Sequence, residues 1–525
     1  MDYLLTIPPF VLSLNYLAIT FLIPLAGFFV VTAAPRRSRL PFFYALVSSL
    51  ATLLAALRLI RPALAHPSAF TSQIDSPWAE SLRIRLHMGV DGISLWLILL
   101  TTLLVPMAVW ATEKMVTERR KSFFAMLLLF EFGLIGVFSA LDLFAFYVFW
   151  EIALVPMYLM VGGWGGANRF KASLKFFVYT MAGSVLMLGS ILYLHGLTGS
   201  FDYVDILKAV SSGQFTLSGY DQVLIFAGFL AAFAVKAPIF PLHTWLPNTY
   251  AEAPMPATFL LAAVMSKMGT YGLLRYGIAL APAAAHRFAP WIAILAIIGI
   301  VYGALLALVQ PNIKRLIAYS SLSHIGFIVL GIFTFNQQGA DGAVYQMLAH
   351  GISTGALFLL AGYLQVRRGS LEIADFGGIA ELAPRLAAAF SIALFASVGL
   401  PVLCNFVGEF LLLQGAALAN FTWAVWAALG VILSAAYMLW MYQRTFLGRL
   451  NEAIEHFHDL QWRDWVPVVP LILLMVWLGC YTQSFMPSIS AATSQLLDGT
   501  NMGNQYRVKV AAPGAVALAE VAHAH

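Results

Sequence analysis

The chain consists mostly of long apolar runs separated by short polar stretches. An apolar run of about 20 residues is long enough for a helix to cross a bilayer. The pattern therefore predicts an all-α polytopic membrane protein with about 14 transmembrane helices. The expected spans are residues 14–34, 41–60, 90–112, 122–141, 142–162, 174–194, 222–242, 255–275, 290–310, 315–335, 342–365, 386–414, 419–443 and 465–485.

Three connections between these spans are longer than the rest. Residues 61–89 and 195–221 are mixed polar segments, and residues 444–464 form an amphipathic, charge-rich loop. The tail from residue 486 is polar and then rich in alanine. We expect this tail to be loosely ordered, because it offers few large apolar side chains to bury.

Proline interrupts two of the expected spans in similar sequence surroundings. VKAP at residues 235–238 lies in the seventh span, and VGLP at residues 398–401 lies in the twelfth. Copies separated by an odd number of spans are inverted relative to each other, as in many transporters. The match is short, but it predicts two inverted repeats of five helices, each with a broken helix. The predicted division is 1–121 for helices 1–3, 122–275 for the first repeat, 290–443 for the second repeat, and 444–525 for the amphipathic loop, last helix and tail.

Composition supports a membrane protein and excludes several other classes. The 525 residues are 61% hydrophobic and only 10% charged, whereas soluble domains are about one-quarter charged. The two cysteines, Cys404 and Cys480, lie in apolar spans, so we expect neither a disulfide framework nor an iron–sulfur cluster or other metal site. Basic residues are spread over short loops, which argues against nucleic-acid binding.

The distribution of lysine and arginine predicts the orientation. Of the 29 such residues, eighteen fall in loops on one side and nine on the other, and the remaining two are Lys236 and Lys267. The positive-inside rule then places both termini on the periplasmic side. The N-terminus lacks a basic region before its first apolar stretch, so we interpret that stretch as a retained span.

Ionisable residues occur near the middle of the apolar spans. A cation at the bilayer centre costs about 2.5–3.5 kcal/mol on insertion scales, so such residues are usually functional. Glu, Lys and His can each bind and release a proton, and seven of them at one depth predict a proton route parallel to the membrane plane. These seven groups are Glu131, Glu151, Lys236, Lys267, His324, His350 and Glu409.

Structural explanations remain open for five residues. Glu131 could only hydrogen-bond between helices, and His324 and His350 could be satisfied packing residues. His243 lies near a span end and could be interfacial, although it closely follows the first proline break. Asp142 opens the fifth span and could be only a helix N-cap.

Six motifs resemble the antiporter-like subunits of respiratory complex I, a family that also includes subunits of multisubunit cation/proton antiporters. The resemblance extends over roughly residues 85–450. The motifs are FWEIALVPM at 149–157, VKAPIFPLHTWLP at 235–247, AEAPMPA at 251–257, KRLIAYSSLSH at 314–324, HGISTGALF at 350–358 and NFVGEF at 405–410.

Within this family the residue in span twelve separates the members. The L and N types have a lysine there and the M type has a glutamate, so Glu409 resembles the M type, the counterpart of mitochondrial subunit 4. The resemblance implies that Glu151 and Lys236 form a gating ion pair and that Lys267 is the central relay lysine. Glu409 would end the route.

The resemblance also implies roles for the remaining site residues. His324 and His350 would join the relay, and His243 would lie beside the break in span seven. Glu131 and Asp142 would link the charge chains of neighbouring subunits.

At the level of the whole protein, the resemblance implies a proton-translocating subunit of bacterial NADH:quinone oxidoreductase in the inner membrane. It would carry no cofactor itself, and flavin, iron–sulfur clusters and quinone would be held by partner subunits. Expected partners are other membrane-arm subunits, including the L-type and N-type antiporter-like subunits, together with lipids, water and protons. Two alternatives remain: a subunit of a cation/proton antiporter that works without NADH, and a scaffold whose buried charges only hold helices together.

Overall fold

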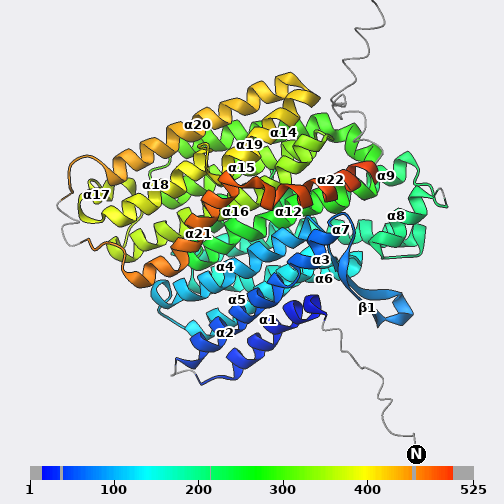
Figure 1. Cartoon of the computed structure of the whole chain (residues 1–525), viewed down its shortest axis with the longest axis horizontal. Helices are drawn as coiled ribbons and strands as arrows, with labels where there is room; N and C mark the ends of the chain where they lie inside the picture. The colour runs from blue at the N-terminus through cyan, green and yellow to red at the C-terminus, as the bar shows by residue number, and fades with distance from the viewer. Residues whose placement is uncertain (1–14, 36–38, 213, 452–456, 500–525) are drawn as a thin grey trace, which may run out of the picture.

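A computed structural model describes residues 15–35, 39–212, 214–451 and 457–499. The chain forms a bundle of long helices that run side by side (Figure 1). Within the described residues, thirteen helices are long and apolar enough to cross a membrane. A further span is divided into two shorter apolar helices, α18 (Pro384–Val398) and α19 (Cys404–Ala419). The predicted polytopic fold with about 14 spans is therefore confirmed.

Twelve of the spans are single helices: α1 (Tyr16–Ala33), α2 (Leu40–Leu57), α4 (Ser94–Met115), α5 (Arg120–Ser139), α6 (Leu143–Trp164), α7 (Arg169–Thr198), α9 (Gly219–Lys236), α14 (Pro282–Leu308), α15 (Ile313–Ile332), α16 (Gln337–Arg368), α20 (Phe421–Phe446) and α21 (Trp462–Cys480). The eighth span consists of α11 (Met255–Leu260), α12 (Ser266–Gly272) and α13 (Ile278–Leu280), joined by π-helical turns at Leu261–Met265 and Leu273–Gly277. Shorter helices are α3 (Ile60–Ala65), α8 (Tyr203–Ser211), α10 (Leu246–Glu252), α17 (Ile379–Leu382) and α22 (Met486–Gly499).

The eighth span and α16 form the centre of the bundle. Their most apolar stretches are completely buried, whereas α1 and α2 bury only about a third of theirs. Apolar residues surround the two central helices on all sides, which is the pattern expected for a helix enclosed by other helices. Ionisable side chains on these two helices are consequently shielded from lipid.

Both proline breaks occur where the sequence predicts them. Helix α9 ends at Lys236, because Pro238 and Pro241 lack the amide hydrogens that would continue it, and α10 resumes at Leu246. Helix α18 ends at Val398, and the next residue, Gly399, has a φ of 82°, a conformation that glycine adopts without strain. The inverted relationship between the two halves stays a prediction.

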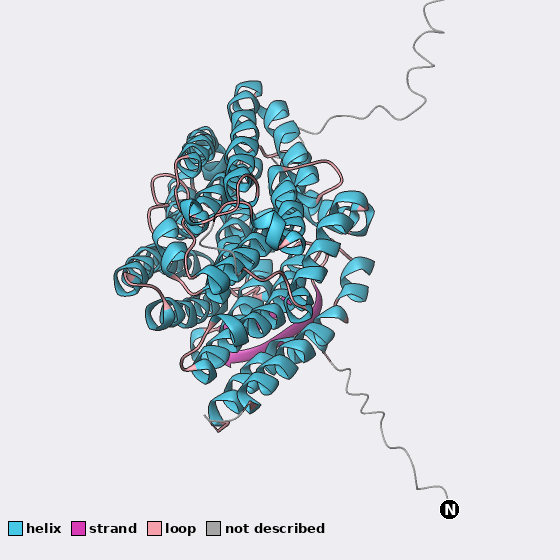
Figure 2. Cartoon of the chain, turned by 90° about the vertical axis from the view of Figure 1, so that its left-hand side faces the viewer, coloured by secondary structure: helices cyan, strands magenta, loops and turns pink. Residues whose placement is uncertain are grey.

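Residues 71–90, part of the segment described from sequence only as mixed polar, form an antiparallel hairpin of β1 (Thr71–Ala79) and β2 (Ile84–Val90), visible as the strands in Figure 2. One sequence-based expectation needs correction. The first part of the tail is not loose, because α22 packs on α16: the Gln337 amide donates to Thr493 at 2.8 Å. The rest of the tail, from residue 500, lies outside the described residues.

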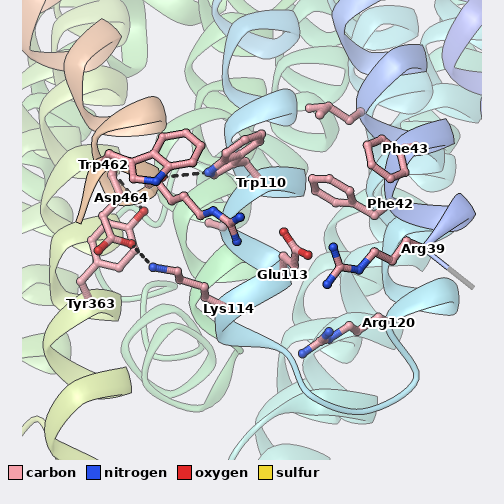
Figure 3. A pocket seen from close by; sticks show the side chains of 13 residues that line it. Arg39, Phe42, Phe43, Trp110, Glu113, Lys114, Arg120, Tyr363, Trp462 and Asp464 are labelled. Carbon is pink, nitrogen blue, oxygen red and sulfur yellow. Dashed lines mark hydrogen bonds and ion pairs between the residues drawn. The ribbon is translucent and has the colours of Figure 1, made fainter. Parts of the chain in front are cut away.

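A buried aspartate attaches the last span to the bundle. Asp464, in the first turn of α21, accepts a hydrogen bond from Lys114 on α4 at 2.7 Å (Figure 3). It accepts a second one from Arg367 on α16, also at 2.7 Å. The negative charge at this helix N-terminus is also favoured by the helix dipole. These contacts fix the ends of three helices at one membrane face.

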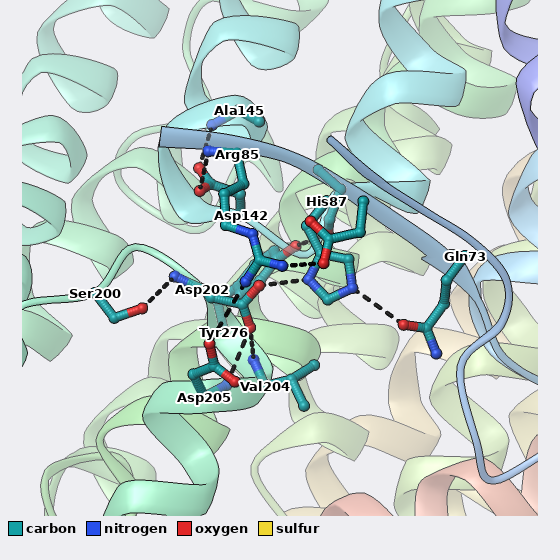
Figure 4. Close-up of polar contacts among 12 residues, drawn as sticks. Gln73, Arg85, His87, Asp142, Ala145, Ser200, Asp202, Val204, Asp205 and Tyr276 are labelled. Atoms are coloured by element: carbon teal, nitrogen blue, oxygen red, sulfur yellow. Dashed lines mark hydrogen bonds and ion pairs between the residues drawn. The ribbon is translucent and has the colours of Figure 1, made fainter. Parts of the chain in front are cut away.

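At the opposite face a second polar cluster fixes the hairpin to the bundle (Figure 4). The Nδ1 atom of His87 in β2 forms an ion pair with Asp202, which caps the N-terminus of α8. Asp142 caps α6 through the Ala145 amide at 2.9 Å and also accepts the Arg85 amide at 3.2 Å. The hairpin therefore fastens the starts of α6 and α8 together.

The His87–Asp202 pair predicts a pH-dependent hairpin. Burial alone lowers the pKa of His87, but the hydrogen bond and charge of Asp202 outweigh burial and raise it above 6.5. Burial alone raises the pKa of Asp202, but the bond from His87 outweighs it and lowers the pKa below 3.8. The pair stabilises the hairpin fully between about pH 4 and 6.5, and this contribution is lost as the pH rises through the raised pKa of His87.

Hydrogen exchange of residues 71–90 measures this effect. We expect amide protection, corrected for intrinsic exchange rates, to decrease as the pH is raised from 6 to 8.5. In His87→Gln the protection should be lower at pH 6 and should not change over that interval. An unchanged pH dependence in His87→Gln would contradict the assignment.

Candidate functional site: a buried Lys–His–His–Glu chain

Lys267 lies in α12 at the centre of the bundle and is almost fully buried. Its ammonium group donates to the Ala262 carbonyl oxygen at 2.7 Å and contacts Nδ1 of His350 on α16 at 2.8 Å. Ala262 belongs to the π-helical turn directly before α12, and such turns often occur at functional sites. The turn therefore helps to hold the lysine nitrogen against a histidine that can accept its proton.

The chain of groups continues from His350 to Glu409. The rings of His350 and His324 on α15 have their centroids 5.5 Å apart. Nδ1 of His324 lies 3.1 Å from Oε1 of Glu409 on α19, and the same oxygen accepts a hydrogen bond from Gln346 at 3.3 Å. Four titratable groups from four helices thus form a buried series. The Lys267–His350 contact is a hydrogen bond, whereas both ring nitrogens of His324 and Nε2 of His350 have no hydrogen-bond partner within the described residues.

Two glycines allow close packing around Glu409, the last member of this series. A Cβ atom at Gly399, in the break between α18 and α19, would collide with the Glu409 carboxylate. A Cβ atom at Gly408 would collide with Gln346, so this glycine lets α19 approach α16 closely. The break and the close approach both serve to place Glu409 beside His324.

Lys236, the last residue of α9, is buried but makes no hydrogen bond within the described structure. Its nitrogen lies 5.4 Å from the Trp150 ring centroid and 5.3 Å from that of Phe176, within the range of cation–π attraction. Glu151 on α6 does not come within ion-pair distance of it, and one of its carboxylate oxygens has no hydrogen-bond partner. The expected contact between Glu151 and Lys236 is therefore not formed in this structure.

Helices α9 and α12 bring the two lysines to neighbouring positions. A Cβ atom at Gly269 would collide with the backbone of Lys236 and Ala237, so the two helices touch here at backbone distance. Gly269 is two residues from Lys267 in the same helix. The described contacts include no direct bond between the two lysine side chains.

The remaining predicted site residues lie apart from this series. Glu131 on α5 is fully buried, and neither carboxylate oxygen has a hydrogen-bond partner. His243, in the break after α9, is buried against the rings of Phe240 and Tyr302. Asp142 lies at a helix end, where it is an N-cap, and burial raises the pKa of its carboxyl although the Ala145 and Arg85 amides oppose this.

Sequence reasoning missed one buried ion pair. Arg275, counted from sequence among the loop arginines although it ends the predicted span 255–275, lies in the second π-helical turn of the eighth span, where it pairs with Asp91 at 2.5 Å. Asp91 also accepts the amides of Ile93 and Ser94 at the start of α4. The apolar residues on both sides of Arg275 were the available signal that it is enclosed.

Sequence reasoning also missed the neutral partners of the series. Gln346 bonds Glu409, and Ser353 donates to Asn405 at 3.1 Å in the same interface between α16 and α19. Such residues carry no distinctive spacing. Only the packing of the two helices identifies them.

Two family models match the chain. The model described as NADH:quinone oxidoreductase/Mrp antiporter matches residues 140–435, and the model described as NADH-ubiquinone oxidoreductase chain 4, amino terminus, matches residues 17–136. The first model includes every member of the series from Lys267 to Glu409. It therefore spans the buried chain described above.

Known proteins resemble the chain over nearly its whole length. NADH-quinone oxidoreductase subunit M of Rickettsia prowazekii is 36% identical over 93% of this chain and 99% of its own length, and that of Rhodobacter capsulatus is 40% identical over 92% and 96%. Among solved structures, a chain of respiratory complex I from Thermus thermophilus aligns with TM-score 0.84 and 33% identity, covering 92% of this chain and 99% of that one.

One further likeness concerns the fold alone. A chain of the Mrp complex from Dietzia sp. aligns with TM-score 0.82 but only 21% identity, over 93% of this chain and 99% of that one. Because one family model matches more than half of the sequence and relatives are 36–40% identical over most of it, the chain belongs to the NADH-quinone oxidoreductase subunit M family, the antiporter-like membrane subunits of respiratory complex I.

Proposed function

We propose that this chain translocates protons across the bacterial inner membrane as one subunit of an NADH:quinone oxidoreductase. The observation that supports this best is the buried series of Lys267, His350, His324 and Glu409. Each member can take up and release a proton, and each belongs to a different helix. A scaffold would need only paired charges, whereas two neighbouring histidines between Lys267 and Glu409 can each accept and pass on a proton.

The contacts suggest an order of proton transfer. Lys267 gives a proton to Nδ1 of His350, which it contacts at 2.8 Å. His350 then passes a proton from its other ring nitrogen towards His324, and Nδ1 of His324 gives one to the Glu409 carboxylate at 3.1 Å. Positive charges on two adjacent members of the series repel each other, so protonation of one member favours loss of a proton from its neighbour.

Lys236 and Glu151 would act as the entry to this series. A carboxylate that approaches Lys236 stabilises its charged form, and one that withdraws leaves a buried ammonium that tends to lose its proton. In this structure Glu151 and Lys236 are separated, which corresponds to the withdrawn arrangement, and two aromatic rings lie next to the lysine nitrogen. Moving a charge against a membrane potential costs about 2.3 kcal/mol per 100 mV, which such a pair can supply.

The proposal extends to the rest of the complex. Oxidation of NADH and reduction of quinone occur in other subunits, which hold the flavin, the iron–sulfur clusters and the quinone, and this chain contributes no redox cofactor. Its neighbours in the membrane are the L-type and N-type antiporter-like subunits.

In this proposal both termini lie on the periplasmic side, as the distribution of Lys and Arg predicts. Glu131 and Asp142 connect the charge series of neighbouring subunits, and His243 adjoins the entry.

The substitution Glu409→Gln tests the proposal. Glutamine preserves the size of the side chain and can still accept the hydrogen bond from Gln346, but it cannot take up a proton. We expect the assembled complex, reconstituted in vesicles, to build a pH gradient during NADH oxidation at least about tenfold more slowly. The matched control is Glu118→Gln, which changes an exposed glutamate between α4 and α5.

Normal pumping by assembled Glu409→Gln would leave only the scaffold explanation. The antiporter alternative is tested separately by purification: copurifying flavin and iron–sulfur subunits support the proposal. Copurification with only small cation-antiporter subunits would contradict it.

A further inference from the structure

On the outside of the bundle, α4 packs between α2 and α21. At the membrane face that carries the loop between α4 and α5, the ends of these three helices form a groove with a cavity of about 400 Å³ (Figure 3). Residues from α2, α4, α5, α16 and α21 line the cavity. The N-terminal and C-terminal spans thus share one opening to the membrane interface.

Three arginines at this cavity are available to bind an anion. Arg39, Arg120 and Arg463 line it, and none forms an ion pair with a carboxylate in the described part of the chain. Glu113 is the one acidic residue of the lining without a cationic partner, because Asp464 is neutralised by Lys114 and Arg367. Figure 3 shows the Arg39 and Arg120 side chains extending towards the space around Glu113. The opening therefore has a positive excess.

Aromatic side chains accompany the arginines. The Trp110 indole donates to the Arg463 carbonyl oxygen at 2.9 Å, which fixes the start of α21 against α4. Trp462 and Phe43 are 69% and 50% exposed at the edge of the cavity. Tryptophan is enriched where membrane proteins meet the lipid headgroups. The cavity therefore lies at headgroup depth rather than in a water-filled loop region.

Apolar side chains continue from the cavity along both walls of the groove. Leu50 and Leu54 on α2 follow the cavity residue Leu46 at intervals of four residues, and both are exposed. Val466 on α21 follows Trp462 at the same interval and is exposed as well. Residues four apart lie on the same helix face, so the walls stay apolar towards the bilayer centre.

We propose that this groove binds an anionic phospholipid of the surrounding leaflet, with its phosphate between the three arginines and an acyl chain between α2 and α21. Guanidinium groups bind phosphate oxygens through paired hydrogen bonds, and basic pockets between transmembrane helices bind lipid headgroups. A free phosphate would satisfy the arginines but would leave the apolar walls unused. The bound lipid connects α2 with α21 at a place where α4 separates them. The inference does not depend on the proton route.

Photolabelling of the intact complex tests this inference. The complex is reconstituted in phosphatidylcholine vesicles containing a minor fraction of phosphatidylglycerol with a diazirine on one acyl chain, and labelled peptides are identified by mass spectrometry. We expect peptides of α2, α4 and α21 to be labelled. The combined substitution of Arg39, Arg120 and Arg463 by glutamine should decrease this labelling by about tenfold or more.

Two sets of variants control for unspecific effects. Lysine at the same three positions keeps the charge and should retain most of the labelling. The second set replaces three exposed residues in the first turns of α7, α15 and α18 by glutamine: Lys171, Arg315 and Arg385. This change removes the same amount of charge from the same membrane face and should leave the labelling unchanged. Assembly of each complex is verified by copurification of its subunits.

Three results would overturn the inference. The first is labelling of α2 and α21 that persists in the glutamine variant. The second is equal labelling by diazirine-bearing phosphatidylcholine, which would show that the groove does not select negative charge. The third is loss of labelling in the presence of inorganic phosphate at unchanged ionic strength, which would assign the arginines to free phosphate.

Discussion

Replacing Lys267 by methionine is expected to abolish proton translocation through this chain. Methionine fills a similar volume, so the packing of α12 should be preserved, but it offers His350 no proton. Loss of a positioned proton donor lowers the rate of such a step by about 10²–10⁴-fold. The measurement is the initial rate of acidification, monitored with a pH-sensitive dye, in vesicles that contain the assembled complex and oxidise NADH.

Lys267→Arg separates a relay from a structural charge. Arginine keeps a positive charge near His350 but does not release its proton in a protein, so a relay predicts that this variant is also inactive. Lys171→Met, which changes an exposed lysine on α7, is the matched control and should pump normally. Normal pumping by Lys267→Arg would show that the charge alone matters and would contradict the relay.

The substitution Asp91→Asn is expected to cause the largest loss of stability. Asparagine can still accept the Ile93 and Ser94 amides, so the start of α4 remains capped, but Arg275 loses its counter-ion. Removing one partner of a buried ion pair costs about 3–5 kcal/mol, because the other charge stays buried and uncompensated. We expect a clearly lower midpoint of thermal unfolding for the purified complex.

A second variant tests the reason for that loss. Adding Arg275→Met to Asp91→Asn removes the uncompensated charge, and a buried pair replaced by neutral groups is often tolerated. The double variant should therefore recover most of the lost stability. If Asp91→Asn alone unfolds at the wild-type temperature, the pair is not a stabilising element.

The sequence alone determined the number of spans and the positions of both breaks, and it predicted the depth of the titratable groups in the membrane. Each of these follows from local properties: the length of an apolar run, the missing amide hydrogen of proline, and the distance of a residue from the span ends. For this reason Lys236 and Lys267 could be identified without any knowledge of their neighbours. The family resemblance then supplied roles that composition and spacing could not.

Only the tertiary structure decided which groups meet. Lys267 contacts His350, 83 residues away, and Arg275 pairs with Asp91, 184 residues away, because helices distant in sequence pack together. The same packing separates Glu151 from Lys236, which the family resemblance implied as an ion pair. The tertiary structure also decided the conformation of the hairpin and of α22, because these short segments become ordered only by packing against the bundle. Periodicity along the chain reports burial, whereas the partner of a buried charge is fixed by the arrangement of several helices.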